Sequence, residues 1–278
     1  MDDILLGKYK DMITQALFCY AIQILLTLGV VFVFGFLISV CNKQVYKKIG
    51  SLGRYVNFAT GAIGTPIHEL AHAIFCIIFG HKIIEIKFFK TDVSDGTLGY
   101  VKHSYDKKNL YHRIGNFFIG IAPIILISGL LCIFANILLP EMMNSLENEA
   151  EKLNVFSGIK EIFDHFKNIV DIFLCYSENI NFYIYVALGT SFALHMSLSR
   201  ADINGMKDGI LFVLLIVLLF DCSCAFVYPK ALIGLTKFTL TASTYIFLVM
   251  LLALVVSISA VILVSTVKRR LNRNGISI

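Results

Sequence analysis

The amino-acid sequence predicts an all-α integral membrane protein with about six transmembrane helices and one small β-hairpin after the second. Of its 278 residues, 57% are hydrophobic and only 15% are charged, and the mean hydropathy is +0.78. A water-soluble fold needs a polar exterior that so few charged residues cannot supply. We therefore expect one membrane domain over residues 1–278, with no nucleic-acid partner, and read the net charge of +5 through membrane topology.

Apolar runs long enough to cross a bilayer define the expected helices, since a span needs about 20 apolar residues. The expected spans are residues 17–41, 56–79, 114–139, 182–198, 209–228 and 240–267. After the second span the pattern changes from helical to alternating, because residues 84–88 read Ile-Glu-Ile-Lys-Phe. This alternation predicts a hairpin over residues 82–104, with Asp95-Gly96 as its turn.

The segment 140–181 is the one sizeable hydrophilic region, and its apolar residues recur at helical spacing. We expect it to form one or two amphipathic helices at the membrane surface. Because Lys and Arg favour the cytoplasmic side, both termini and the loops 81–113 and 199–208 are expected there, and the acidic 140–181 insert outside. The basic residues of 42–54 oppose this orientation. The expected location is a bacterial cell membrane, crossed several times.

The cysteines are scattered through the apolar runs and include no Cys-x-x-Cys pair. They stand at positions 19, 41, 76, 132, 175, 222 and 224. We interpret them as small apolar packing residues and expect no disulfide framework.

The segment His68-Glu69-Leu70-Ala71-His72 carries the chemistry, within the second expected span. Residues four apart share one face of a helix, so His68 and His72 can offer two imidazoles to one metal ion, with Glu69 beside them. Ionisable groups at membrane depth cost about 2–4 kcal/mol each, which favours a functional role. Satisfied polar residues in a helix bundle are the alternative interpretation.

A catalytic zinc ion usually has three protein ligands and one open position, so a third ligand is missing from this motif. The candidates are Asp202, Asp208, His195, His103, His81 and Asp221. We favour Asp202, because it lies within a turn of the end of the fourth span, at a depth close to the motif. Asp208 precedes an apolar run and is also explained as a helix cap.

Two further residues are weaker candidates for the site. His195 either orients a ligand from behind or makes a hydrogen bond between helices. Asn116 could donate a hydrogen bond to an oxyanion, although we favour a contact between helices as its explanation. His81 and His103 are interpreted as interfacial loop residues.

The chain resembles the site-2 protease family of intramembrane zinc metalloproteases over roughly residues 56–215. The resemblance rests on His-Glu-Leu-Ala-His-Ala at residues 68–73, the apolar run ending Phe-Gly-His-Lys-Ile at 79–83, the hairpin, and Gly-Ile-Ala-Pro at 120–123. It implies one zinc ion per chain, held by His68, His72 and an aspartate that the family commonly carries in Leu-Asp-Gly. This chain instead offers Asp-Ile-Asn-Gly at 202–205 and Lys-Asp-Gly at 207–209, and its 140–181 insert is too short for the family's PDZ domain.

The expected function is therefore hydrolysis of peptide bonds in membrane-embedded or membrane-adjacent polypeptides, within the lipid bilayer. Glu69 would take a proton from water and pass it to the leaving amine. One alternative is a membrane metalloprotease that cuts in the aqueous phase and uses a glutamate of 141–151 or Glu161 as third ligand. Another is a non-catalytic metal-binding membrane transport or assembly factor.

Overall fold

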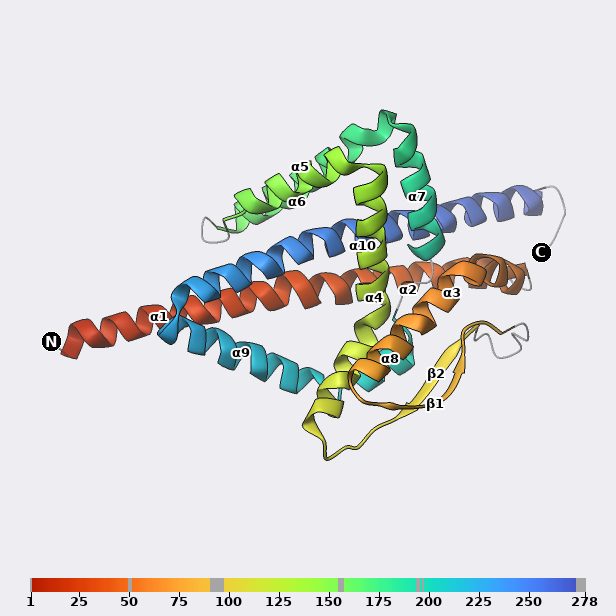
Figure 1. Cartoon of the computed structure of the whole chain (residues 1–278). Coiled ribbons are helices and arrows are strands. Elements are labelled where there is room, and N and C mark those ends of the chain that lie inside the picture. Colours follow the sequence, from red (N-terminus) through yellow and green to blue (C-terminus); the bar gives the residue numbers. More distant parts are fainter. Residues whose placement is uncertain are drawn as a thin grey trace.

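A computed structural model describes residues 2–49, 52–90, 98–154, 158–193, 196 and 198–273 as a mostly helical chain with one two-stranded hairpin (Figure 1). The elements in chain order are α1 (Asp2–Ile24), the π-helix η1 (Leu25–Gly29), α2 (Val30–Ile49), α3 (Leu52–Ile78), β1 (Lys82–Lys87), β2 (Tyr100–Ser104), α4 (Leu110–Leu138), α5 (Pro140–Lys152), α6 (Ile159–Cys175), the short 3₁₀ helix η3 (Tyr176–Glu178), α7 (Ile180–Ala193), α8 (Arg200–Met206), α9 (Ile210–Val227) and α10 (Pro229–Arg273).

Five helices within the described residues are long and apolar enough to cross a membrane, so the protein is a multi-pass membrane protein. They cover Gly7–Val45, Gly61–Ile78, Leu110–Leu138, Ile210–Val227 and Pro229–Arg270. The hairpin follows the second of them, as predicted. The expected fourth span is α7, an apolar helix of 14 residues, which is short for a full crossing.

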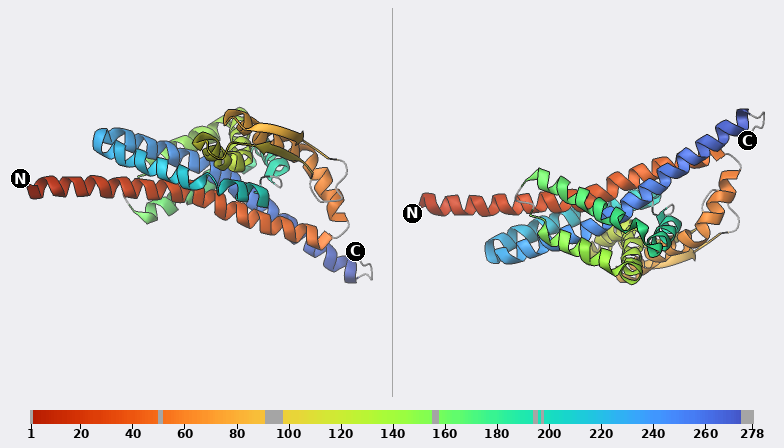
Figure 2. Two further views of the ribbon diagram at one scale, coloured as in Figure 1. Left: turned by 90° about the horizontal axis from the view of Figure 1, so that it is seen from below. Right: turned by 90° about the horizontal axis from the view of Figure 1, so that it is seen from above.

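Two long helices lie side by side through the molecule. The first is continuous from α1 through η1 to α2, and α10 packs along it (Figures 1 and 2). At the far end of this pair Lys48 donates from Nζ to Ser265 Oγ at 2.6 Å, and Lys268 donates to the carbonyl oxygen of Lys48 at 2.9 Å. The sequence indicated a span only at residues 17–41, because apolarity marks where a helix can enter lipid and not where its backbone hydrogen bonds stop.

The helix α4 crosses this long pair steeply, and its N-terminal part packs against α3 (Figure 1). Its first turn is capped by Asn109, whose side chain accepts hydrogen bonds from the backbone N–H groups of Tyr111 and His112. Buried apolar side chains of α2, α4, α5, α6, α7 and α10 form the main core around α4.

The helix α3 ends at a glycine turn. Gly80 has φ +69°, a backbone conformation that favours glycine. The backbone N–H of His81 donates to the carbonyl oxygen of Cys76 at 2.8 Å, and that of Gly80 donates to Ile77 at 3.2 Å. These two bonds are a Schellman motif, which folds the chain back over the last turn of α3.

The strands β1 and β2 pair antiparallel beside α3 and α4, with Lys82 opposite Ser104 and Lys87 opposite Tyr100. A register shift between Ile83 and Glu85 interrupts the alternation that the sequence predicted. The expected Asp95-Gly96 turn lies outside the described residues.

The 140–181 insert forms two amphipathic helices, as expected. α5 and α6 pack together at the end of α4 away from the hairpin (Figure 1). Pro140 begins α5 at a position where its missing N–H costs nothing. The insert is anchored by His165, which is buried and bonds through Nε2 to Thr244 Oγ1 of α10 at 3.0 Å.

Candidate metal and peptidase site

The two motif histidines lie one turn apart on α3, facing α4. His72 donates from Nδ1 to the carbonyl oxygen of Ile119 on α4 at 2.8 Å. A carbonyl can only accept, so in the neutral ring Nε2 carries the free electron pair. This Nε2 lies 3.1 Å from Nε2 of His68. The backbone of α4 thereby orients one imidazole toward the other, as outer partners commonly orient metal-binding histidines.

Asp202 completes the group from α8. Its Oδ1 lies 3.3 Å from His72 Nε2, and its Oδ2 lies 4.0 Å from His68 Nε2. Oδ2 also accepts a hydrogen bond from the backbone N–H of Ser199 at 2.7 Å, while Ser199 Oγ accepts from the N–H of Asp202 at 3.1 Å. This reciprocal pair is a capping box, which starts α8 and holds the carboxylate in place.

The position of α8 depends on a glycine of α4. A Cβ atom on Gly120 would lie 3.0 Å from the carbonyl oxygen of Asp202 and 3.0 Å from Sδ of Met206. Only a residue without a side chain allows this approach, which brings the start of α8 to the histidines of α3. Within the Gly-Ile-Ala-Pro segment at residues 120–123, Gly120 is thus the residue that lets α8 approach α4.

Glu69 is buried beside the histidines, 8% exposed, against the hairpin. A Cβ on Gly99 would lie 2.8 Å from Glu69 Cγ, so the backbone leading into β2 passes directly over this side chain. The motif borders a cavity of about 340 Å³. Its walls come from α3, the β2 edge, α4 and α8: His68, Glu69, His72, Gly99, Tyr100, Val101, His103, Asn116, Ile119, Gly120, Ser199, Ala201, Asp202 and Gly205.

Asp208 is engaged elsewhere, in a polar cluster between α4 and the turn before α9. Arg113 donates to its Oδ1 from Nε at 3.1 Å and from Nη2 at 2.8 Å, and Tyr105 donates to Oδ2 at 3.1 Å. The Arg113 guanidinium holds the pKa of the Asp208 carboxyl below its ordinary value. Asn116 of α4 lines the cavity, and its Nδ2 donates to Asp208 Oδ2 at 3.3 Å. This bond links α4 to the turn before α9.

The remaining candidates for the third ligand are not grouped with the histidine pair and Asp202, or lie outside the described residues. Asp221 is buried where α9 meets α1 and α10, with Gln23 Nε2 3.5 Å from its Oδ1. His195 lies outside the described residues. His81 and His103, interpreted from the sequence as interfacial loop residues, lie in the turn after α3 and on β2, with their Nδ1 atoms 2.9 Å apart. Burial, followed by the nearby His81 and His72 rings, lowers the pKa of His103 to about 4, so its ring is neutral at pH 7.

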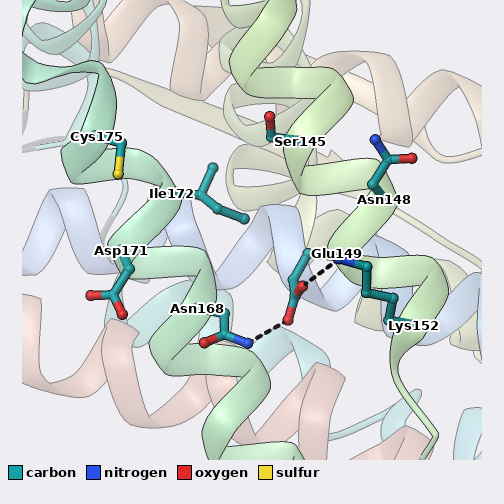
Figure 3. A pocket seen from close by; sticks show the side chains of 8 residues that line it. All are labelled: Ser145, Asn148, Glu149, Lys152, Asn168, Asp171, Ile172 and Cys175. Atoms are coloured by element: carbon teal, nitrogen blue, oxygen red, sulfur yellow. Dashed lines mark hydrogen bonds and ion pairs between the residues drawn. The ribbon is translucent and has the colours of Figure 1, made fainter.

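A second hollow, of about 430 Å³, lies between α5 and α6 (Figure 3). Glu149 is its most connected residue, accepting from Asn168 Nδ2 at 2.8 Å and lying 3.6 Å from Lys152 Nζ. The described residues that line it include no histidine. It lies at the other end of α4 and has no part in the histidine site.

The donor atoms of His68, His72 and Asp202 suit a zinc ion. Tetrahedral bonds of about 2.0–2.2 Å place donor atoms roughly 3.3–3.6 Å apart. The three closest donor pairs here are 3.1, 3.3 and 4.0 Å apart, and all three ligand atoms lie within 4.8 Å of one another. Two imidazoles and one carboxylate also form a donor set that catalytic zinc uses. The three residues therefore fit the metal.

Residues 61–147 match a family model described as "Putative zincin peptidase" (DUF3267). The match covers the motif, the hairpin and α4, and it implies zinc; it ends before Asp202. Neither a curated protein nor a solved structure matches the chain. The family named by the match is zincin peptidase, which is coarser than the site-2 protease resemblance drawn from the motif.

Proposed function

We propose that this protein is an intramembrane zinc metalloendopeptidase, related to the site-2 proteases, that cuts membrane-embedded or membrane-adjacent polypeptides. One observation carries the proposal: two histidines, a glutamate and an aspartate from separate elements converge on one cavity, and three of the four belong to an apolar helix of membrane-spanning length. The match to a zincin peptidase family supports the peptidase chemistry.

His68, His72 and Asp202 would hold the metal. When bound, zinc supplies a Lewis acid that polarises a scissile carbonyl and acidifies a water molecule. His72 contributes an imidazole whose tautomer is fixed by Ile119 on α4. Asp202 contributes a carboxylate whose second oxygen is held by the Ser199 backbone. Both ligands are oriented by the protein, which lowers the cost of assembling the site.

Glu69 would be the general base and acid. Its place on the wall of the cavity, next to His68 and under Gly99, lets its carboxylate take a proton from water and return it to the leaving amine. Asn116 is positioned by Asp208 on the same wall, and the second N–H of its amide could reach the substrate oxyanion.

The hairpin would bind the substrate. A helical polypeptide must unwind before a peptide carbonyl is free to react, and an unwound segment can add to an exposed strand edge. β2 supplies Tyr100, Val101 and His103 to the cavity wall, so a polypeptide bound beside it would pass near Glu69. The substrate class that fits is therefore an extended segment of a membrane protein or peptide.

The motif lies in an apolar helix of membrane-spanning length, which favours cleavage within the bilayer over cleavage in water. The glutamates of α5 and α6 are poor third ligands, because α4 separates Ile119 from Pro140 by 21 residues, about 30 Å of helix.

The orientation with both termini in the cytoplasm, in a bacterial cell membrane, is part of the proposal. It places the hairpin and the α7–α9 loop on the cytoplasmic side.

The replacement Glu69→Gln tests the function. In liposomes that also contain single-span test polypeptides, we expect zinc content to stay at the wild-type level and fragment formation, read by mass spectrometry, to fall by about 10²-fold or more. Undiminished cleavage would refute the mechanism. A wild-type protein that holds zinc and cuts none of a broad set of such polypeptides would instead favour a non-catalytic metal-binding role.

A further inference from the structure

Cys76, His81 and His103 form a second group of metal-ligating side chains, next to the proposed peptidase site and sharing none of its proposed metal ligands, although His103 also lines the cavity. One ligand atom from each lies within 4.8 Å of the others. Cys76 is fully buried, and His81 is 5% exposed. The proposed mechanism gives Cys76 and His81 no role, and it uses His103 only as part of the cavity wall.

The backbone brings two of them together. Cys76 lies one turn after His72 on α3, and the Schellman turn at Gly80 folds His81 back so that its N–H bonds the carbonyl oxygen of Cys76. Strand β2 then returns across this turn and adds His103. The end of α3, the turn that follows it and strand β2 therefore meet at one point, where Cys76 and His81 are buried and His103 is partly buried.

The hydrogen bonding of His81 directs an electron pair into the cluster. Its Nε2 donates to the carbonyl oxygen of His112 at 2.9 Å, so Nδ1 of the neutral ring is an acceptor. This Nδ1 lies 2.9 Å from Nδ1 of His103. The arrangement repeats that of His72, whose outward nitrogen donates to the Ile119 carbonyl while the other faces a second imidazole.

We infer that Cys76, His81 and His103 bind a second zinc-type metal ion that fastens the hairpin to α3. A thiolate and two imidazoles select zinc and related borderline or soft metals over magnesium and calcium. Binding releases the thiol proton of Cys76 to solvent, and the ion joins thiolate and two nitrogens, with a fourth position open to water. His72 and Cys76 are about 6 Å apart along the helix, so the two sites hold separate ions.

The proposed ion would keep the cavity wall in place. Strand β2 carries His103 and also contributes Tyr100 and Val101 to the peptidase cavity. An ion bound by both His103 and Cys76 would fix this strand to α3, the helix that carries Glu69. The ion would position the strand and take no part in the reaction. Metal binding by these three residues can therefore be tested without measuring peptidase activity.

Metal content of the full chain in detergent tests the inference. We expect two zinc ions per chain in the wild type and one in Cys76→Ser, in His103→Gln and in Asp202→Ala. The double variant Cys76→Ser/Asp202→Ala should hold none. Cys19→Ser is the matched control, since Cys19 is also fully buried but packs with Ala225 and Leu232 away from both sites, and it should keep two.

Cobalt substitution gives a readout that only a sulfur ligand produces. The wild type loaded with Co²⁺ should show a near-ultraviolet band from thiolate-to-cobalt charge transfer, kept in Asp202→Ala and lost in Cys76→Ser. A wild type without this band, or with one zinc ion that Cys76→Ser retains, overturns the inference, whether or not each variant folds. The remaining outcome is a wild type with one zinc ion that Asp202→Ala retains and Cys76→Ser loses. This result would support the Cys76 site and refute the metal site at His68, His72 and Asp202.

Discussion

His72 Nε2 lies 3.3 Å from Oδ1 of Asp202, although 130 positions separate the two residues in the chain. The imidazole is oriented from behind by the Ile119 carbonyl, and the carboxylate by the Ser199 backbone. Each partner is thus fixed by its own neighbours before any metal arrives. Substitution of Asp202 therefore tests whether it is the third metal ligand.

Replacing the two candidate aspartates shows which of them is a zinc ligand. Asp202→Ala should lose the zinc ion of the histidine site, whereas Asp208→Ala should keep it, because Asp208 is bound to Arg113 and Tyr105. Asp202→Asn keeps a side-chain oxygen that can accept the Ser199 N–H but loses the charge, so α8 should start normally while zinc binds more weakly. Zinc content after dialysis against a chelator measures all three. Zinc loss in Asp208→Ala alone would refute the assignment.

A methyl group at Gly120 should weaken the metal site from outside it. Gly120→Ala pushes against the Asp202 carbonyl and Met206, and overpacking of this kind costs about 1–3 kcal/mol. We expect lower zinc affinity in a competition assay with a fluorescent chelator. Gly129→Ala on the same helix is the control, because a Cβ there meets no atom within 4 Å. Equal affinities in the two variants would contradict the close packing of α8 on α4.

A methyl group at Gly99 should impair turnover while sparing zinc. Its Cβ would meet Glu69 Cγ at 2.8 Å and the carbonyl oxygens of Lys87 and Phe88 at 2.9 Å, so strand or glutamate must move. We expect kcat to fall about tenfold or more with unchanged zinc content, since a shift of the base by 1 Å is costly. Gly205→Ala, which also lines the cavity but meets nothing within 4 Å, should behave as wild type.

The Arg113–Asp208 pair should stabilise the protein in a pH-dependent way. Arg113 holds the pKa of Asp208 below its ordinary value of 3.8, so the unfolded chain binds this proton more readily than the folded one. The stabilisation, about 1 kcal/mol for a partly exposed pair, is present above pH 4 and is lost as pH falls through the lowered pKa. Asp208→Asn should lower the Tm at pH 7, and the difference should shrink toward pH 3.

The exposed Lys167–Asp171 pair on α6 supplies the control for this titration. Its two side chains are 75% and 58% exposed, and such pairs contribute little. Asp171→Asn should leave the Tm nearly unchanged across the same pH range. A Tm deficit of Asp208→Asn that stays constant down to pH 3 would mean that packing, and not charge, is responsible.

The sequence predicted the membrane class, the hairpin and the two insert helices, because each depends on a short-range pattern. Hydropathy marks helices such as α4, and alternation at residues 84–88 marks β1. The length of α1–α2 escaped prediction, since helix ends are set by packing and capping as well as by apolarity. The register shift in the hairpin has no signal in the alternation itself.

For the site, His68, Glu69 and His72 were evident from spacing alone, while the favoured Asp202 rested on an estimate of depth. The Gly120 contact that places α8 could not be read from one sequence, because it joins distant segments. The Cys76 cluster was missed for the same reason, as His81 and His103 looked like separate loop residues. Its one local signal was the four-residue spacing of His68, His72 and Cys76 along one helix face.

The capping box at Ser199 and Asp202 has a consequence for synthesis. The ribosome releases α3, with Glu69 and both histidines, long before α8, and N-terminal segments settle first. Until Ser199 and Asp202 have emerged and wound the first turn of α8 against Gly120, the growing chain has two of the three proposed ligands. The proposed metal site is therefore incomplete while the chain is being made.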